Sequence, residues 1–284
     1  MNKQIFPIAL LTVAAIGSTF SSTATADPFL PDFASAMFDN SLNIDNPYFP
    51  LMPGQRYHFS SEPAPGEDGD SERILVEVLP DTKTILGVET RVVRDRVWLI
   101  HPMFGELLIE DTFDWYAQDN AGNVWYMGEY VTDHLYDPSG VETGTIHAGS
   151  WEAGVAGALP GYIMEANPPT VGHNYRQEYY LGEAEDQAEV LALDAIVDIP
   201  FGMFTAAQIE ETSDLDPDAL EHKFFAPGIG KVLGYGLDPD TEDIIAITTL
   251  VAITPEPTTA MLALFAAICL PSFLATARRG SKGR

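Results

Sequence analysis

The chain has 284 residues, of which 42 are acidic and only 14 are basic, so its formal net charge is −28. This balance argues against a nucleic-acid partner, because phosphate binding requires clustered Lys and Arg side chains. A single Cys excludes a disulfide bond within the chain. Hydrophobic residues make up 46% of the chain and aromatic residues 11%, a composition that supports a packed core and argues against general disorder.

The first 26 residues are typical of a secretory signal peptide. Lys3 is the only charged residue among them, an apolar stretch covers residues 5–17, and a segment rich in Ser and Thr follows. Ala24 and Ala26 fit the small-x-small rule for signal peptidase. We therefore predict removal of residues 1–26 and a mature chain that begins at Asp27.

The other end of the chain predicts a transmembrane helix over residues 258–277. This stretch contains no charged residue, and twenty residues at the helical rise span about 30 Å, the thickness of the hydrocarbon layer. Arg278 and Arg279 follow at once, and such a basic flank marks the cytoplasmic side. The body of the protein is then expected outside the inner membrane.

Pro255, Glu256 and Pro257 directly precede this span. A Pro-Glu-Pro tripeptide, one terminal hydrophobic span and a basic tail resemble the PEP-CTERM sorting signal of Gram-negative bacteria. The resemblance implies recognition by an exosortase, a membrane-embedded cysteine protease or transpeptidase that removes residues 255–284. It also implies delivery to the cell envelope or the extracellular matrix. The hydrophobic span alone equally allows a permanent single-span anchor.

Processing leaves a strongly acidic body, residues 27–254. This region holds nine basic and 41 acidic residues, a net charge of −32. The only cysteine, Cys269, lies in the removable span. The mature protein then has no thiol, which excludes Cys nucleophiles and thiolate metal sites.

The body predicts an all-β fold, a single antiparallel domain with a curved sheet or an open half-barrel, because segments of high β propensity recur between short turns. Ala184–Leu193 is the best helical rival, and Gly157–Gly172 is the stretch most able to interrupt the domain. The predicted strand segments are Gln55–Ser60, Glu72–Val78, Lys83–Ile100, Glu106–Gln118, Asn123–Thr132, Tyr175–Leu181, Ala188–Leu193, Met203–Glu211, Leu220–Ala226, Lys231–Gly236 and Asp243–Ile253.

The clearest local unit is a hairpin over Asp111–Val131 with a turn at 119–122. Aromatic residues stand on both faces of its two strands, so two interpretations stay open. In one, a curved sheet grips a ligand through Trp115, Tyr116, Trp125 and Tyr126. In the other, one face joins the core and the other lies under a covered edge.

The body is also similar to an uncharacterised group of secreted bacterial proteins. The similarity implies one domain over most of residues 46–236 and no particular chemistry. It lies in the segments Asn46–Leu51, Ile85–Val88, Arg91–Asp95, Asp114–Asp119, Gly122–Tyr126, Gly149–Val155, Tyr175–Tyr180, Gly182–Asp186 and Glu221–Lys223.

Metal binding has weak support in the sequence. The six histidines never stand two or four residues apart, so we predict surface or locally bonded roles for them and no committed metal site. Calcium is the better candidate cofactor, because it prefers oxygen ligands. Three acidic loops, at 67–70, 214–218 and 238–243, could supply such ligands, although solvated turns are the simpler interpretation.

Catalysis also has weak support, and we do not expect an enzyme. Glu183, Glu185, Asp186 and Glu189 form a dense acidic segment that could hold a catalytic pair. The chain has no G-x-S-x-G element, P-loop or dinucleotide fingerprint. Three arginines at 91, 94 and 96 could contact an anion or uronate, or could pair with acidic residues across a sheet.

Taken together, these patterns predict an exported envelope or matrix protein with a non-catalytic binding or structural role. Its partners are signal peptidase and exosortase during export, with extracellular polysaccharide as a candidate ligand. A secreted polysaccharide hydrolase with paired carboxylates and a calcium-dependent adhesin are the alternatives.

Overall fold

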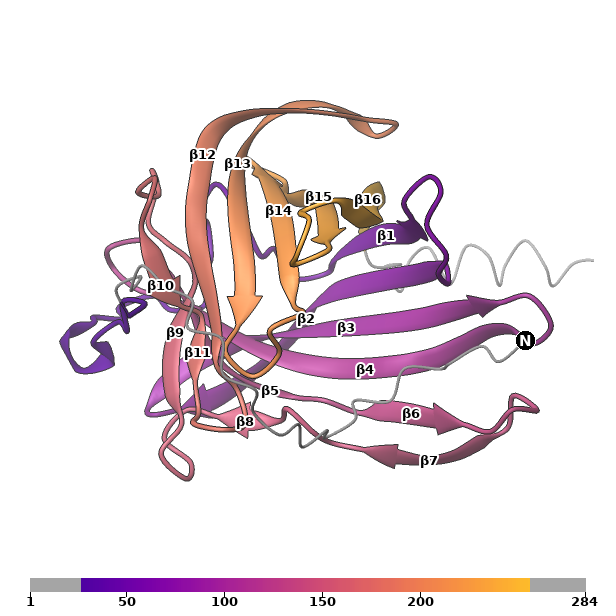
Figure 1. Ribbon diagram of the computed structural model, residues 1–284. Helices are drawn as coiled ribbons and strands as arrows, with labels where there is room; N and C mark the ends of the chain where they lie inside the picture. Colours follow the sequence, from indigo (N-terminus) through magenta and orange to yellow (C-terminus); the bar gives the residue numbers. More distant parts are fainter. Residues whose placement is uncertain (1–26, 256–284) are drawn as a thin grey trace, which may run out of the picture.

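The computed structural model describes residues 27–255, and within this range the regular structure is almost entirely β (Figure 1). This confirms the all-β prediction. A short 3₁₀ helix, η1 (Phe33–Ser35), precedes the strands. These are β1 (Gln55–Pro63), β2 (Glu72–Ile85), β3 (Val88–His101), β4 (Gly105–Gln118), β5 (Val124–Tyr130), β6 (Asp133–Tyr136), β7 (Glu142–Ile146), β8 (Trp151–Glu152), β9 (Leu159–Met164), β10 (Asn174–Arg176), β11 (Glu178–Tyr179), β12 (Asp186–Ile199), β13 (Gly202–Ser213), β14 (Leu220–Ala226), β15 (Gly230–Leu237) and β16 (Ile244–Pro255).

The strands form one antiparallel sheet in the order β10-β12-β13-β14-β15-β16-β1-β2-β3-β4-β5-β9-β11, with β6, β7 and β8 attached beside β4 and β5. The first and last long strands of the body, β1 and β16, pair with each other at the middle of the sheet, with Gln55 opposite Pro255. Pro255 is the last described residue of the sheet. Glu256 and Pro257, residues 1–26 and the predicted span 258–277 lie outside the described residues. Residues 27–255 contain no helix of the length and hydropathy needed to cross a membrane.

The sheet curves around a concave interior (Figure 1). Strands β2, β3, β4 and β12 each have 14 residues, and long strands accumulate twist. Both ends of the strand order meet in one short stretch of chain, because β10 pairs with β12 while β11 pairs with β9. At this junction a Cβ on Gly161 would lie 2.1 Å from the carbonyl oxygen of Arg176. The close approach therefore requires glycine.

The predicted hairpin over Asp111–Val131 is confirmed as β4 and β5, with Gln118 opposite Val124. The predicted continuous strand Lys83–Ile100 is wrong. A two-residue turn at Leu86 and Gly87, with φ of 50° and 82°, divides it between β2 and β3. Left-handed backbone at both positions is the geometry of a type I′ hairpin turn. The sequence did not predict this turn, because leucine is not a residue that usually occupies its first position.

Asp119 organises the turn between β4 and β5. Its carboxylate accepts hydrogen bonds of 2.9 Å from the backbone N–H groups of Ala121 and Asn123 and from the indole Nε1 of Trp125. Asp119 is 8% exposed. Substituting it leaves the indole N–H of Trp125, which is 1% exposed, buried without an acceptor, and this is costly.

We expect Asp119→Ala to lower the free energy of unfolding by about 2 kcal/mol. Asp137→Ala is the matched control, because Asp137 makes similar bonds to Ser139 and Val141 in an exposed turn. That control is expected to cost much less than Asp119→Ala, because solvent replaces the lost bonds in an exposed turn. Urea unfolding measures both, and an equal loss in the two variants would contradict this account of the turn.

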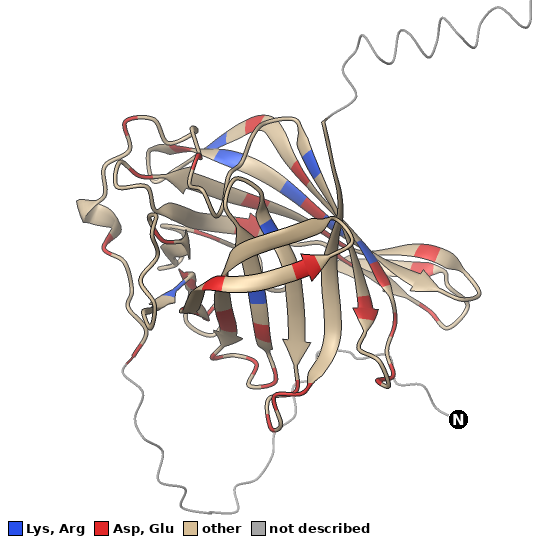
Figure 2. Cartoon of the chain, turned by 90° about the horizontal axis from the view of Figure 1, so that it is seen from above, with Lys and Arg blue, Asp and Glu red and all other residues tan. Residues whose placement is uncertain are grey.

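All nine basic residues of the body lie on strands, whereas the acidic residues also occupy the turns (Figure 2). On the outer face, the guanidinium of Arg94 lies 2.5 Å from the carboxylate of Asp111, and Arg96 and Arg56 both contact Glu77. The interpretation of Arg94 and Arg96 as partners in cross-strand ion pairs is thus confirmed. Arg91 instead donates to the backbone carbonyl oxygens of residues 79 and 80.

Candidate functional site

The concave interior contains a half-enclosed cavity of about 190 Å³. Strands β1 to β4 form one wall and β13 to β15 form the facing wall. Its lining combines aromatic rings with charged side chains of both signs, a mixture typical of ligand sites rather than of a plain core. The rings belong to Phe49, Tyr57, Phe59, Tyr116 and Phe225, and the charges to Asp95, Asp114, Glu211, Lys223 and Lys231.

Strand register explains why these polar residues face inward. Val76 lies opposite Asp95, and Val93 lies opposite Asp114. Directly opposed residues in neighbouring strands point to the same side of a sheet. On the facing wall, a bulge between Phe224 and Phe225 sets Phe225 opposite Lys231. The bulge thereby turns a ring and an ammonium group toward the two aspartates.

Both aspartates have a raised pKa. Burial raises the pKa of Asp95 to about 6, although Lys231 opposes the shift. Burial, with repulsion from Glu129, raises the pKa of Asp114 well above its ordinary value. Within the described residues, Asp95 Oδ1 has no hydrogen-bond partner. A buried polar atom of this kind calls for a water molecule or a ligand group to satisfy it.

The two lysines differ in how they are paired. The Lys223 ammonium contacts Glu211 and lies 3.0 Å from Glu221 Oε2. Burial opposes the charge, but these two carboxylates raise the pKa of Lys223 above its ordinary value. Lys231 forms no ion pair within residues 27–255 and lies 4.9 Å from the ring centroid of Phe59. Burial and the nearby Lys223 lower its pKa. Because it has no ion-pair partner there, the Lys231 amine can donate hydrogen bonds to a ligand.

Tyr116 and Tyr126, two of the four predicted ligand-face residues, lie beside this cavity. Their rings stack with centroids 5.0 Å apart, and the Tyr126 hydroxyl donates to Asp114 Oδ1 at 2.7 Å. Tyr116 lines the cavity itself. The tyrosine pair therefore shapes one wall and fixes the orientation of Asp114.

Trp115 and Trp125, the other two predicted ligand-face residues, are buried in packing. Trp125 is 1% exposed and lies under the rings of Phe33 and Tyr162, at 5.3 Å and 4.6 Å between centroids. The Lys83 ammonium covers the Trp115 ring at 3.2 Å. The structure therefore separates the four aromatic residues, with the tyrosines toward the cavity and the tryptophans against covering segments.

The acidic segment around Glu183 does not form a facing pair. Glu183 is exposed, whereas Glu185 is buried and accepts a hydrogen bond from the backbone N–H of Gly182. Neither lines the interior cavity. Several histidines have local partners, such as His173 with Glu165 at 2.7 Å and His222 with Glu210 at 3.1 Å.

The candidate calcium loops show turn geometry. Asp238 accepts from the backbone N–H groups of Asp240 and Thr241, and Asp216 accepts from that of Asp218. No group of three or more His, Cys, Asp or Glu side chains in residues 27–255 is arranged to hold a metal ion.

Two residues of the cavity, Lys223 and Lys231, had only a faint signal in the sequence. The body contains only three lysines, these two and Lys83. Lys223 and Lys231 lie on either side of the turn at Pro227 and Gly228. The rarity of lysine in so acidic a region was the only indication in the sequence that these two residues could have a functional role. Their convergence with Asp95, more than a hundred residues away, depends on the curvature of the sheet.

No protein-family model matches this chain, and no curated protein matches it. Solved structures similar to it include a Bacteroides fragilis protein assigned as exported, with a YmcC-like fold (12% identity, 74% of this chain and 99% of that chain, TM-score 0.43). A protein assigned as a lipoprotein from Parabacteroides distasonis is also similar (11% identity, 74% and 99%, TM-score 0.38). A DUF1329 family protein from Desulfovibrio piger follows (5% identity, 72% and 86%, TM-score 0.26). These likenesses are too distant to assign a family or an activity.

Proposed function

We propose that this chain is an exported protein of the cell envelope or extracellular matrix that binds a saccharide unit, without catalysis, in its interior cavity. The observation that carries the proposal is the lining of the cavity. It places aromatic rings, an unpaired carboxyl oxygen on Asp95 and an ammonium group without an ion pair on Lys231 around one half-enclosed space.

A sugar ring suits this lining better than an apolar or a highly charged ligand. Its hydroxyl groups both donate and accept hydrogen bonds, so they can pair with Lys231 as donor and with Asp95 as acceptor. Its apolar C–H faces can pack against rings such as Phe59 and Tyr116. The cavity charges partly offset one another, because two lysines face three carboxyl groups, and burial raises the pKa of two of these, Asp95 and Asp114.

The same cavity defines the competing hypothesis, a hydrolase in which Asp95 and Asp114 act as the paired carboxylates. A pKa of about 6 for Asp95 favours it, because a catalytic acid works best near the ambient pH. Against it, Asp114 is engaged by the Tyr126 hydroxyl.

Binding of oligosaccharides prepared from the host's own extracellular polysaccharide tests the proposal. For the exported protein purified from its host, we expect one binding site and roughly tenfold weaker binding in Lys231→Met and in Asp95→Asn. Arg73→Met is the matched control, because Arg73 pairs with Glu106 on the outer surface. Absence of binding would overturn the proposal, and release of new reducing ends would favour the hydrolase.

We further propose that the two ends of the chain, residues 1–26 and 255–284, direct export and sorting. Signal peptidase is expected to cut after Ala26, and an exosortase near Pro255-Glu256-Pro257. Intact mass of the protein from the native host, with and without its exosortase, checks both cuts. Cleavage at the same place in both strains, or in neither, would refute the sorting proposal, and absence of cleavage in both would favour a permanent anchor.

A further inference from the structure

The long hairpin of β12 and β13 folds over the outer face of β14, β15 and β16 (Figure 1). Two register shifts in β12, between residues 190 and 192 and between residues 192 and 195, interrupt its pairing with β13. Bulges of this kind bend a strand sharply. Beyond them, regular pairing resumes and continues to the tip, where Ile199 lies opposite Gly202. The sequence thus builds a bent, internally paired strap.

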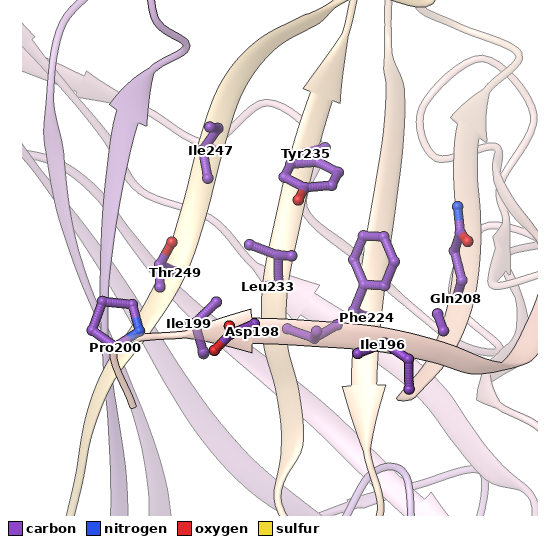
Figure 3. Close-up of a pocket in the computed structure, with 12 residues that line it drawn as sticks. Ile196, Asp198, Ile199, Pro200, Gln208, Phe224, Leu233, Tyr235, Ile247 and Thr249 are labelled. Carbon is purple, nitrogen blue, oxygen red and sulfur yellow. The ribbon is translucent and has the colours of Figure 1, made fainter. Parts of the chain in front are cut away.

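A cavity of about 500 Å³ lies between the strap and the sheet. Its floor is a row of opposed residues across β13 to β16, in which Gln208, Phe224, Leu233 and Thr249 follow one another. Tyr235 and Ile247 form the next row. Figure 3 shows the strap segment crossing these strands, with Ile199 and Pro200 near its end. The volume falls within the range of roughly 300–1,000 Å³ typical of small-molecule pockets.

This cavity is distinct from the interior one. On β14, Phe224 faces the strap, whereas Lys223 and Phe225 line the interior cavity. No hydrogen bond within the described residues joins strap residues 195–200 to β14, β15 or β16. Side-chain packing alone therefore holds the strap over the sheet, and the space beneath it can admit a ligand without breaking a strand pair.

The lining specifies the chemistry of that ligand. Its side chains are mostly aliphatic or aromatic, and Asp198 is the only charged one among them. An apolar chain gains by leaving water for such a surface, whereas an anionic head group would meet Asp198 and the net negative charge of the body. Gln208, Tyr235 and Thr249 supply amide and hydroxyl groups that can pair with an uncharged polar head.

We infer that the cavity beneath the β12–β13 strap binds a lipid with an aliphatic chain and an uncharged, hydroxyl-bearing head group. The strap also carries an exposed apolar side chain at the cavity, Ile196, which is 70% exposed. Such a surface suits an element that meets lipid. This site is independent of saccharide binding in the interior.

The test is calorimetric titration of the exported protein with glycerol monolaurate below its micelle concentration, and with laurate, which has the same chain and an anionic head. We expect one glycerol monolaurate per chain and roughly tenfold weaker binding of laurate. Ile196→Asp places a charge on a lining side chain that is 70% exposed. It is expected to weaken glycerol monolaurate binding about tenfold.

Met203→Asp is the matched control, because Met203 is equally exposed on the same hairpin but does not line the cavity. A second variant, Thr249→Trp, fills the floor of the cavity and is expected to abolish binding, with circular dichroism confirming its fold. Failure of glycerol monolaurate to bind, equal binding of laurate, or equal losses in Ile196→Asp and Met203→Asp would overturn the inference. Saccharide binding should be unchanged in all these variants, so the two proposals fail separately.

Discussion

Raising the pH from 5 to 9 is expected to destabilise the protein by a few kcal/mol in free energy of unfolding. Burial is the main cause, and it raises the pKa of both Glu129 and Glu178 to about 8. These carboxyls lie near Asp114, whose pKa is also raised. The ordinary pKa of a glutamate side chain is 4.5.

The sign follows from the protons that each state holds. Between pH 4.5 and 8 the folded protein keeps protons on these groups that the unfolded chain has already released. Stability is therefore greatest in mild acid and falls as the pH rises through about 8. In stronger acid the protein is expected to lose stability again. Lys223 lowers the pKa of Glu221 and outweighs burial, which raises it. Protonating Glu221 at low pH then removes a stabilising charge.

Thermal unfolding across this pH range measures the effect, and Glu178→Gln identifies its source. The glutamine is neutral at every pH, so the decline toward pH 9 is expected to be shallower in this variant. Glu67→Gln, in an exposed loop, is the matched control and should leave the profile unchanged. High salt separates the buried groups from general repulsion of the acidic surface, because salt screens the latter more strongly. A profile that rises toward pH 9 would contradict the assignment.

Lys223→Met is expected to lower the free energy of unfolding by about 3–5 kcal/mol at pH 7. The Lys223 ammonium contacts Glu211, whose side chain is 15% exposed, and Glu221 at 3.0 Å. Methionine keeps much of the volume but removes the charge. Glu211 is then left buried without its cation, and an uncompensated buried charge is strongly destabilising.

Urea unfolding measures this loss, and two comparisons show its origin. Adding Glu211→Gln to Lys223→Met is expected to restore part of the stability, because it removes the stranded charge. Lys83→Met is the matched control: its ion pair with Glu152 is about one-third exposed. We expect it to cost only about 1 kcal/mol. Equal losses at the two lysines would show that burial of the Lys223 pair has no special weight.

Strand content and local hairpins could be predicted from the chain because their causes are local. Alternation along Asp111–Val131 and the turn at Asp119 depend on residues close in sequence, and both agree with the structure. The break at Leu86 and Gly87 escaped prediction because a leucine stands at a left-handed turn position that usually favours Asn, Asp or Gly.

Which face of each strand turned inward depended on the tertiary structure. Period-two alternation sorts Trp115 from Tyr116 but does not say which of them meets the interior, since both faces carry aromatic rings. The cavity also required curvature, the junction at residues 174–179 and the bulge that aims Lys231. Asp95 and Lys231 lie on distant strands, and their presence in one cavity depends on long-range strand pairing that no local pattern encodes.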